Sequence, residues 1–164
     1  KNAKRIVLRT KCDAVKLEGG KKIINIVKHL VKNKIPVMGH LGLLPQSETG
    51  KFSFKGKKLA ERNRIFRDAK LLESAGVFSL VLECVEQSLA KLITNSIKVP
   101  TIGIGSSFNC DGQVLVTDDL IGLNPINVRF IKQYSNIRKV INNAVLNFKK
   151  EVKKNKFPTK KYSY

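Results

Sequence analysis

The stretch Phe78-Ser79-Leu80-Val81-Leu82-Glu83-Cys84-Val85 decides the fold that this sequence predicts. Its apolar side chains follow one another without the alternation of a half-exposed strand, which is typical of a strand buried on both faces in a parallel sheet. Apolar stretches of similar length recur at residues 14–17, 36–38, 99–104 and 113–116. We therefore expect five short strands.

Amphipathic segments separate these strands. In residues 21–33, Ile23, Val27 and Leu30 recur at helical spacing with lysines on the other side. Residues 58–75 and 87–97 repeat the pattern, and each segment precedes the next strand. Strand, helix and strand in this order indicate βαβ units, hence an α/β fold with a parallel sheet and a single domain over residues 1–164.

Two segments depart from this rhythm. Residues 39–56 are too long for an ordinary connection between a strand and a helix, and ordered loops of that length are usually functional. Residues 128–152 look helical, and residues 149–164 form a lysine-rich tail. We interpret this basic tail as a solvated or loosely docked terminus rather than a binding arm.

The formal net charge of +20 raises the question of a nucleic-acid partner. Most of the excess is lysine, and it is scattered along the 164 residues. Readers of bases and phosphates tend to use arginine forks and interleaved aromatic side chains, and neither pattern is present. The charge therefore indicates a solvated basic surface, and we expect no nucleic-acid partner.

Other sequence features favour a cytoplasmic protein with no membrane partner. No apolar run approaches the roughly 20 residues that span a bilayer, and no signal-peptide pattern is present. The three cysteines Cys12, Cys84 and Cys110 form no CxxC pair, so they are interpreted as reduced thiols.

Polar side chains follow every predicted strand at the point where it ends. Glu83 is the first example, because its carboxylate stands in an apolar run, where an unpaired charge is costly to bury. Partial burial of this kind suits a general base. A glutamate that caps a strand end or bridges to a lysine explains the same pattern equally well. Because the carboxyl ends of parallel strands lie on one side of a sheet, we expect such groups to converge.

Lys16 and Glu18 are two residues apart on a predicted strand, so they share one face. They could hold the carboxylate of a substrate and a divalent metal, respectively, since oxygen ligands suit magnesium. A structural ion pair is the alternative. His40 follows the second strand and could donate to a substrate oxyanion, although a lone histidine there is more often structural.

Two further candidates are weaker. The run Gly103-Ile104-Gly105 resembles a phosphate-binding turn, but a lone GxG is better explained as a tight turn. Asp118 and Asp119 could bind metal or cap a short helix that follows them.

At these same residues the chain is similar to the ketopantoate hydroxymethyltransferase family over essentially its whole length. The matching motifs, in order, are Val15-Lys16-Leu17-Glu18-Gly19-Gly20, Pro36-Val37-Met38-Gly39-His40-Leu41-Gly42-Leu43-Leu44-Pro45-Gln46-Ser47, Asp68-Ala69-Lys70-Leu71-Leu72-Glu73-Ser74-Ala75-Gly76, Val81-Leu82-Glu83-Cys84-Val85, Ile102-Gly103-Ile104-Gly105 and Asp111-Gly112-Gln113-Val114-Leu115-Val116. The order and spacing of these motifs carry the resemblance.

The resemblance implies a (β/α)8 TIM barrel that transfers a hydroxymethyl group from 5,10-methylenetetrahydrofolate to α-ketoisovalerate, giving ketopantoate for pantothenate biosynthesis. Magnesium would bind the keto acid and acidify its C3 proton. Glu83 would then be the base, Glu18 would belong to the metal shell, and Lys16 and His40 would bind substrate. The segment 45–56 would line the site, and the protein would be a homo-oligomer.

The resemblance also implies that the chain holds only the last five of eight strands with their helices. The family's first strands, with two aspartates that bind the metal and keto acid, have no counterpart in the sequence. We therefore expect this chain alone to be inactive. Two alternatives remain: a related magnesium-dependent keto-acid lyase that needs no folate, and a binding module for RNA or an acidic partner.

Overall fold

The structure is a computed structural model that describes residues 1–47, 53–125 and 128–164. The chain divides into two compact units, Lys1–Val114 and Leu115–Tyr164, and each is described by itself. Within the residues that the structure describes, no helix is long and apolar enough to cross a membrane.

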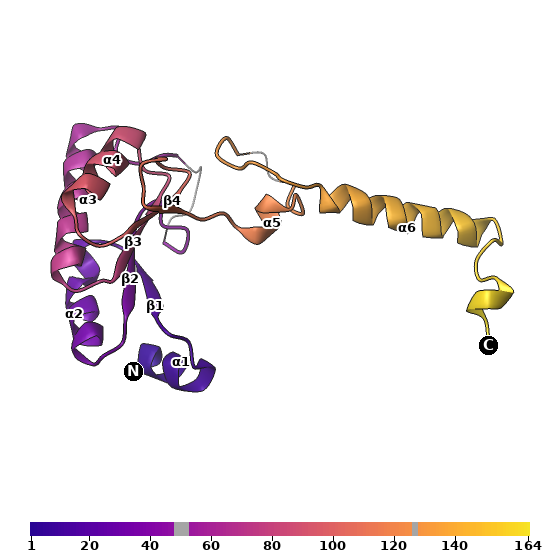
Figure 1. The fold of residues 1–164 in the computed structure, drawn as a ribbon, viewed down its shortest axis with the longest axis horizontal. Helices are drawn as coiled ribbons and strands as arrows, with labels where there is room; N and C mark the ends of the chain where they lie inside the picture. The colour runs from indigo at the N-terminus through magenta and orange to yellow at the C-terminus, as the bar shows by residue number, and fades with distance from the viewer. Residues whose placement is uncertain (48–52, 126–127) are drawn as a thin grey trace. The chain divides into compact units, whose positions relative to one another are not determined.

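The first unit is a parallel sheet of five strands in the order β1-β2-β3-β4-β5, in which helices connect the first four strands (Figure 1). Its elements are α1 Asn2–Thr10, β1 Val15–Glu18, η1 Lys21–Ile23, α2 Ile24–Lys32, β2 Val37–Gly42, α3 Leu59–Ser74, β3 Ser79–Glu83, α4 Gln87–Ser96, β4 Thr101–Ile104 and β5 Gly112–Gln113. The predicted α/β fold and its parallel sheet of five strands are confirmed. The isolated parallel bridge between Lys55 and Val85 ties the end of the long β2–α3 connection to the sheet.

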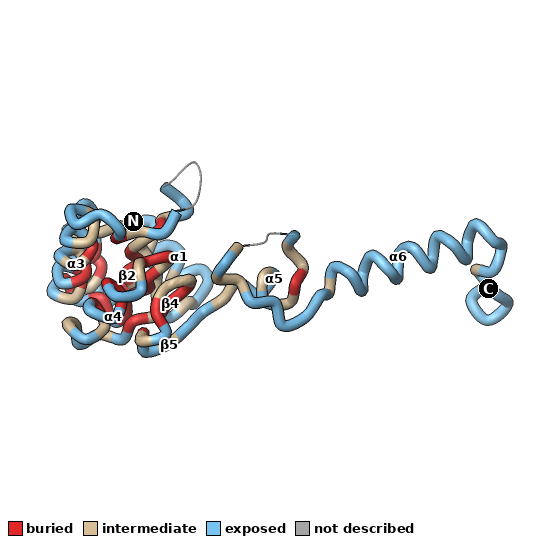
Figure 2. Tube along the Cα trace, turned by 90° about the horizontal axis from the view of Figure 1, so that it is seen from above, coloured by how far each residue is buried: buried red, intermediate tan, exposed pale blue. Residues whose placement is uncertain are grey.

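Helices α2, α3 and α4 lie on one face of the sheet (Figure 1). The core between these layers includes Leu72 of α3, Leu89 of α4 and Leu80 of β3, all completely buried. Figure 2 shows the buried residues along the strands and the inner turns of these helices. Burying a leucine side chain contributes about 2 kcal/mol, so this layer accounts for much of the unit's stability.

The strand predicted at residues 113–116 is largely wrong. β5 is limited to Gly112–Gln113, after which the backbone amide of Val114 still donates to the Gly103 carbonyl at 3.0 Å. Val114 and Val116 are half exposed, so burial does not favour a longer strand at these residues.

The second unit contains α5 Thr117–Leu120, α6 Ile137–Lys153 and η2 Lys160–Tyr162. The helix predicted at residues 128–152 therefore begins nine residues too early. The backbone amides of Tyr134 and Ile137 donate to the carbonyls of Leu120 and Ile121, at 2.8 and 3.0 Å, and these bonds replace helical ones. The Asn136 side chain then caps α6 by accepting from the Lys139 amide at 3.0 Å.

The predicted basic tail is partly ordered. Its first residues continue α6 to Lys153, and Phe157 then stacks edge-on against Phe148 at 5.4 Å and near Tyr162 at 5.9 Å between ring centroids. The lysines of this segment are exposed, as predicted.

Candidate active site

Three strands bring one histidine and two glutamates together. Glu18 at the end of β1 lies opposite His40 of β2, and the next strand ends at Glu83. The Nδ1 atom of His40 lies 3.6 Å from Oε1 of Glu18, and its Nε2 atom lies 3.2 Å from Oε2 of Glu83. The predicted convergence at the carboxyl ends of the strands is therefore found for these three residues.

Side chains along β2 alternate between the two faces of the sheet, and this places the cluster on the face away from the helices. A Cβ atom on Gly39 would lie 3.3 Å from Leu72 of α3, so Gly39 faces the helical layer. Successive residues of a strand point to opposite faces, so His40 points the other way. His40 was predicted to follow the strand, and that detail is wrong: β2 continues to Gly42, which places His40 inside it.

The imidazole of His40 is enclosed. Its side chain is 1% exposed, whereas the Glu18 and Glu83 side chains retain 10% and 16%. Among the described residues, neither ring nitrogen makes a hydrogen bond of good geometry. A neutral imidazole carries a single N–H, so it can donate to only one of the two carboxylates at a time. The other carboxylate is then available for a proton or a cation.

Contacts from two other segments hold the end of β1 and its Glu18 carboxylate. Its Oε2 atom accepts from the backbone amide of Gln46, at 3.2 Å, at the start of the long connection after β2. The following Gly20 has no room for a side chain, because a Cβ there would lie 2.1 Å from the Asp68 carboxylate. Asp68 accepts from the Lys21 amide at 3.1 Å, so α3 holds this turn in place.

The backbone around Glu83 is equally constrained. The Glu83 carbonyl accepts from the Leu43 amide at 2.8 Å, and this approach requires the glycine at position 42, whose φ is +100°. Cys84 has a φ of 50°, which is uncommon for a residue with a side chain. Burial, and then the neighbouring Glu83 carboxylate, raise the pKa of the Cys84 thiol to about 11. This thiol is therefore protonated at neutral pH and unsuited to nucleophilic chemistry.

Lys16 lies on β1 two residues before Glu18, so both belong to the same face of the sheet. Its side chain is exposed, unlike the cluster beside it. The structure therefore offers an ammonium group on the face that carries the two carboxylates.

The weaker candidates lie elsewhere. Gly105 has a φ of 60° and follows β4, which agrees with a tight turn. Asp118 and Asp119 belong to α5 in the second unit, where Asp119 accepts from the Asn124 side chain at 2.8 Å. Part of the predicted site segment 45–56, residues 48–52, lies outside the described residues.

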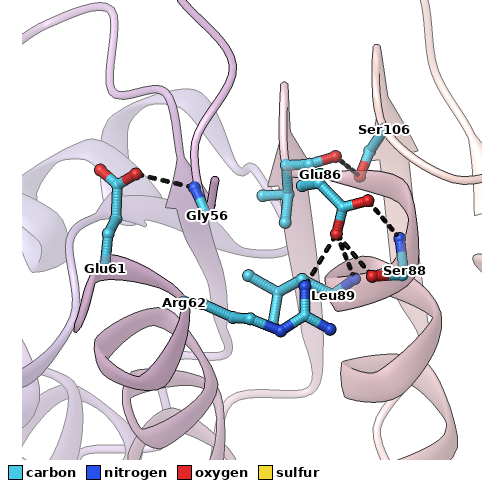
Figure 3. Close-up of polar contacts among 8 residues, drawn as sticks. Gly56, Glu61, Arg62, Glu86, Ser88, Leu89 and Ser106 are labelled. Carbon is cyan, nitrogen blue, oxygen red and sulfur yellow. Dashed lines mark hydrogen bonds and ion pairs between the residues drawn. The ribbon is translucent and has the colours of Figure 1, made fainter. Parts of the chain in front are cut away.

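Sequence reasoning missed the polar cluster centred on Glu86, three residues after Glu83 (Figure 3). Glu86 is the N-cap of α4, and its carboxylate accepts from Ser88 and Arg62. Glutamate is not among the residues usually found at an N-cap, so the pattern carried no signal. The three cysteines are free, as predicted.

Comparison with known proteins identifies the family of this chain. Residues 1–160 match the family described as ketopantoate hydroxymethyltransferase. The chain is 72% identical over 163 residues to the 3-methyl-2-oxobutanoate hydroxymethyltransferase of Pelagibacter ubique, covering 99% of this chain and 63% of that protein. It is 44% identical to the protein of the same name from Clostridioides difficile, covering 100% of this chain and 61% of that protein.

A third relative, from Caldivirga maquilingensis, bears the same name and is 47% identical, covering 99% of this chain and 62% of that protein. The chain thus spans about three fifths of the length of the curated relatives it matches. With a family match that extends over nearly all of its residues, the chain belongs to the ketopantoate hydroxymethyltransferase family.

Proposed function

We propose that the protein transfers a hydroxymethyl group from 5,10-methylenetetrahydrofolate to α-ketoisovalerate, giving ketopantoate and tetrahydrofolate, as a step of pantothenate biosynthesis. One water supplies the hydroxyl oxygen in the overall balance. The observation that carries the proposal is the enclosed cluster of Glu18, His40 and Glu83 at one side of a parallel sheet. Family membership and the names of the relatives support it.

Glu83 is the base in this proposal, and it removes the C3 proton of the keto acid. Its carboxylate keeps 16% of its surface exposed, so a substrate can reach it, and His40 lies 3.2 Å away on the other side. An N–H on Nε2 would donate to the Glu83 carboxylate and hold it in place, whereas an N–H on Nδ1 would face Glu18 instead. The proton taken from C3 stays on the Glu83 carboxyl in this step.

Lys16 and Glu18 serve substrate and metal binding. The exposed Lys16 ammonium on the same face suits the substrate carboxylate, as a compact positive charge. Glu18 presents oxygen atoms, which magnesium prefers, and is mostly buried. Within the described residues no group of three or more histidine, cysteine, aspartate or glutamate side chains could hold a metal. In this proposal Glu18 would be one ligand of a shell completed by other oxygens. Magnesium, when bound, would polarise the keto acid and acidify its C3 proton.

We also propose that the sheet is part of a (β/α)8 barrel, with residues 1–164 belonging to that one domain. Parallel strands in sequential order, with α2, α3 and α4 on one face, support a barrel wall whose inner face carries the polar cluster. We propose a cytoplasmic homo-oligomer whose basic surface serves solubility rather than nucleic-acid binding.

Exchange of the C3 hydrogen of α-ketoisovalerate for deuterium tests the base assignment. The reaction is followed by proton NMR in D2O with magnesium, without folate, on the protein as the organism makes it. We expect Glu83→Gln to lower the exchange rate by about 10²–10⁴-fold, the usual contribution of a general base. The control Asp13→Asn changes an exposed carboxylate before β1 and should leave the rate unchanged.

Product formation with the folate donor completes the test. We expect ketopantoate to form only when 5,10-methylenetetrahydrofolate is present. A Glu83→Gln protein that exchanges the C3 hydrogen within about threefold of the unsubstituted rate would rule out Glu83 as the base, because a lost base costs far more.

A further inference from the structure

The turn that follows Glu83 is held in an unfavourable conformation by its neighbours. Cys84 adopts a φ of 50°, where a Cβ crowds the backbone. Its amide donates to the Ile104 carbonyl of β4 at 2.9 Å, and its carbonyl accepts from the Lys55 amide at 2.7 Å. Strained backbone of this kind persists where surrounding contacts over-determine it, and it gathers at functional sites.

Both sides of this turn are hydrogen-bonded to other parts of the chain. The Glu86 amide donates to the Lys55 carbonyl at 2.8 Å, which completes the parallel bridge beside Val85. The Ser106 hydroxyl donates to the Val85 carbonyl at 3.1 Å from the opposite side (Figure 3). The connections that follow β2 and β4 therefore meet on the turn that carries Glu83.

Four donors converge on the carboxylate of Glu86. The Ser88 amide and the Leu89 amide donate at 3.0 Å each, as the free N–H groups of a helix start. The Ser88 hydroxyl adds a bond of 2.7 Å and Arg62 Nη1 one of 2.8 Å (Figure 3). These bonds, led by those from Ser88, lower the pKa of Glu86 to about 2, so the carboxylate is charged throughout the physiological range.

Arg62 links this carboxylate to the segment that crosses the turn. It lies in the first turns of α3, next to Glu61, whose carboxylate accepts from the Gly56 amide at 2.8 Å. Gly56 follows Lys55 directly, so α3 holds the crossing segment through Glu61 and the turn through Arg62. A Cβ on Gly56 would lie 2.5 Å from Leu89, so the segment also packs closely on α4.

We propose that Glu86, through its bonds to Arg62 and Ser88, is a positioning residue that fixes the direction of the Glu83 carboxylate. The inference rests on the proposed function, in which Glu83 removes the C3 proton. Glu86 touches no reacting atom in this scheme. It locks the three-residue turn between the base and α4, and a displacement of about 1 Å in a catalytic group can cost on the order of 100-fold in rate.

Two substitutions test the proposal by the same deuterium exchange, well below the unfolding temperature. Glu86→Gln keeps the size of the side chain and removes its charge, and Arg62→Met keeps most of the apolar stem and leaves the helix cap intact. For both we expect the maximal exchange rate to fall about 10–50-fold, with the half-saturating concentration of α-ketoisovalerate within about twofold. A loss in rate at constant apparent affinity indicates a displaced base rather than a lost binding contact.

Two further variants separate positioning from simple stabilisation. Glu86→Asp retains an N-cap residue of a favoured type, but its side chain is one methylene too short to keep Arg62 in place. Compared with Glu86→Gln, it should therefore recover more of the folding stability than of the exchange rate. Arg67→Met is the matched control, because Arg67 is an exposed arginine of the same helix α3 whose Nε donates to the Asn63 carbonyl of that helix at 3.3 Å. Its exchange rate should be unchanged.

The result that overturns the inference is a normal exchange rate in the folded Arg62→Met and Glu86→Gln proteins. The inference also falls if the exchange rate drops only in proportion to the unfolded fraction measured by circular dichroism, because Glu86 would then be only a helix cap. If the unsubstituted protein does not exchange the C3 hydrogen, the proposed function and this inference fall together. If it exchanges and only Glu83→Gln abolishes exchange, this inference alone falls.

Discussion

The charge of Glu86 should make a measurable and pH-dependent contribution to stability. Its pKa is lowered from the ordinary 4.5 to about 2, by bonds from Ser88 first. A tenfold change in proton affinity corresponds to about 1.4 kcal/mol, so the full difference would amount to roughly 3 kcal/mol. The side chain is 30% exposed, and solvent screening reduces this by about half. We therefore expect Glu86→Gln to lower the free energy of unfolding by about 1.5 kcal/mol at pH 7, close to the usual value of an N-cap.

The sign of the pH dependence follows from the lowered pKa. A carboxylate that holds its proton less tightly in the folded state stabilises the protein above its unfolded pKa, and loses that effect as pH falls through its folded pKa. The difference between the two proteins should be complete above about pH 5.5, clearly smaller near pH 3.5 and absent below about pH 2.

Urea unfolding of both proteins at pH 7 and near pH 3.5 provides the measurement. Glu151→Gln, which removes an exposed carboxylate from α6, is the control and should change the free energy of unfolding by less than about 0.5 kcal/mol. An unfolding difference for Glu86→Gln that is the same at both pH values would refute this reasoning, because the contribution would then not come from the charge.

Two other predictions follow from the backbone and the thiols around Glu83. Gly42→Ala places a Cβ about 2.1 Å from the Glu83 carbonyl at a φ of +100°. We therefore expect it to lower the free energy of unfolding, measured with urea, by about 3 kcal/mol or more. The control Gly112→Ala meets only the flexible end of Ile102, so it should lower the free energy of unfolding less. Iodoacetamide at pH 8 should modify the partly exposed Cys12 first. It should leave Cys84 unmodified until the protein unfolds, because Cys84 is buried and its pKa is about 11. Mass spectrometry of the peptides measures this order, and modification of Cys84 before Cys12 in the folded protein would contradict the prediction.

Sequence patterns predicted the repeating part of the fold well because packing dictates it. The run around Leu80 and Leu82 must be buried on both faces, and the helices on either side show the period of a surface helix. The parallel order of the strands followed from these periods. The start of α6 could not be predicted in the same way, because contacts of Tyr134 and Ile137 with residues near α5 outweigh a helical pattern.

The residues of the candidate site and their convergence could be predicted from the sequence, whereas the detailed geometry of the cluster could not, and the roles of the residues stay predictions. Glu18, His40 and Glu83 could be named from their place after apolar runs, yet the enclosure of His40 between two carboxylates depends on strand register, which a single sequence does not specify. Glu86 and Arg62 gave no local signal, since their partnership joins two helices that are separated in the sequence. Long-range polar contacts of this kind appear only when the elements are packed.

The alternation of side chains along β3 between the core and the polar cluster restricts how the length of this strand can vary within the family. Leu82 enters the core and the next residue, Glu83, enters the polar cluster, so the same few residues serve folding and chemistry on opposite faces. Inserting or deleting one residue in β3 would exchange the two roles, burying a carboxylate under α3 and α4 and presenting a leucine to His40. Selection can therefore change the composition of this strand more freely than its length. Insertions and deletions among natural variants should be confined to the connections, above all to the long one between β2 and α3.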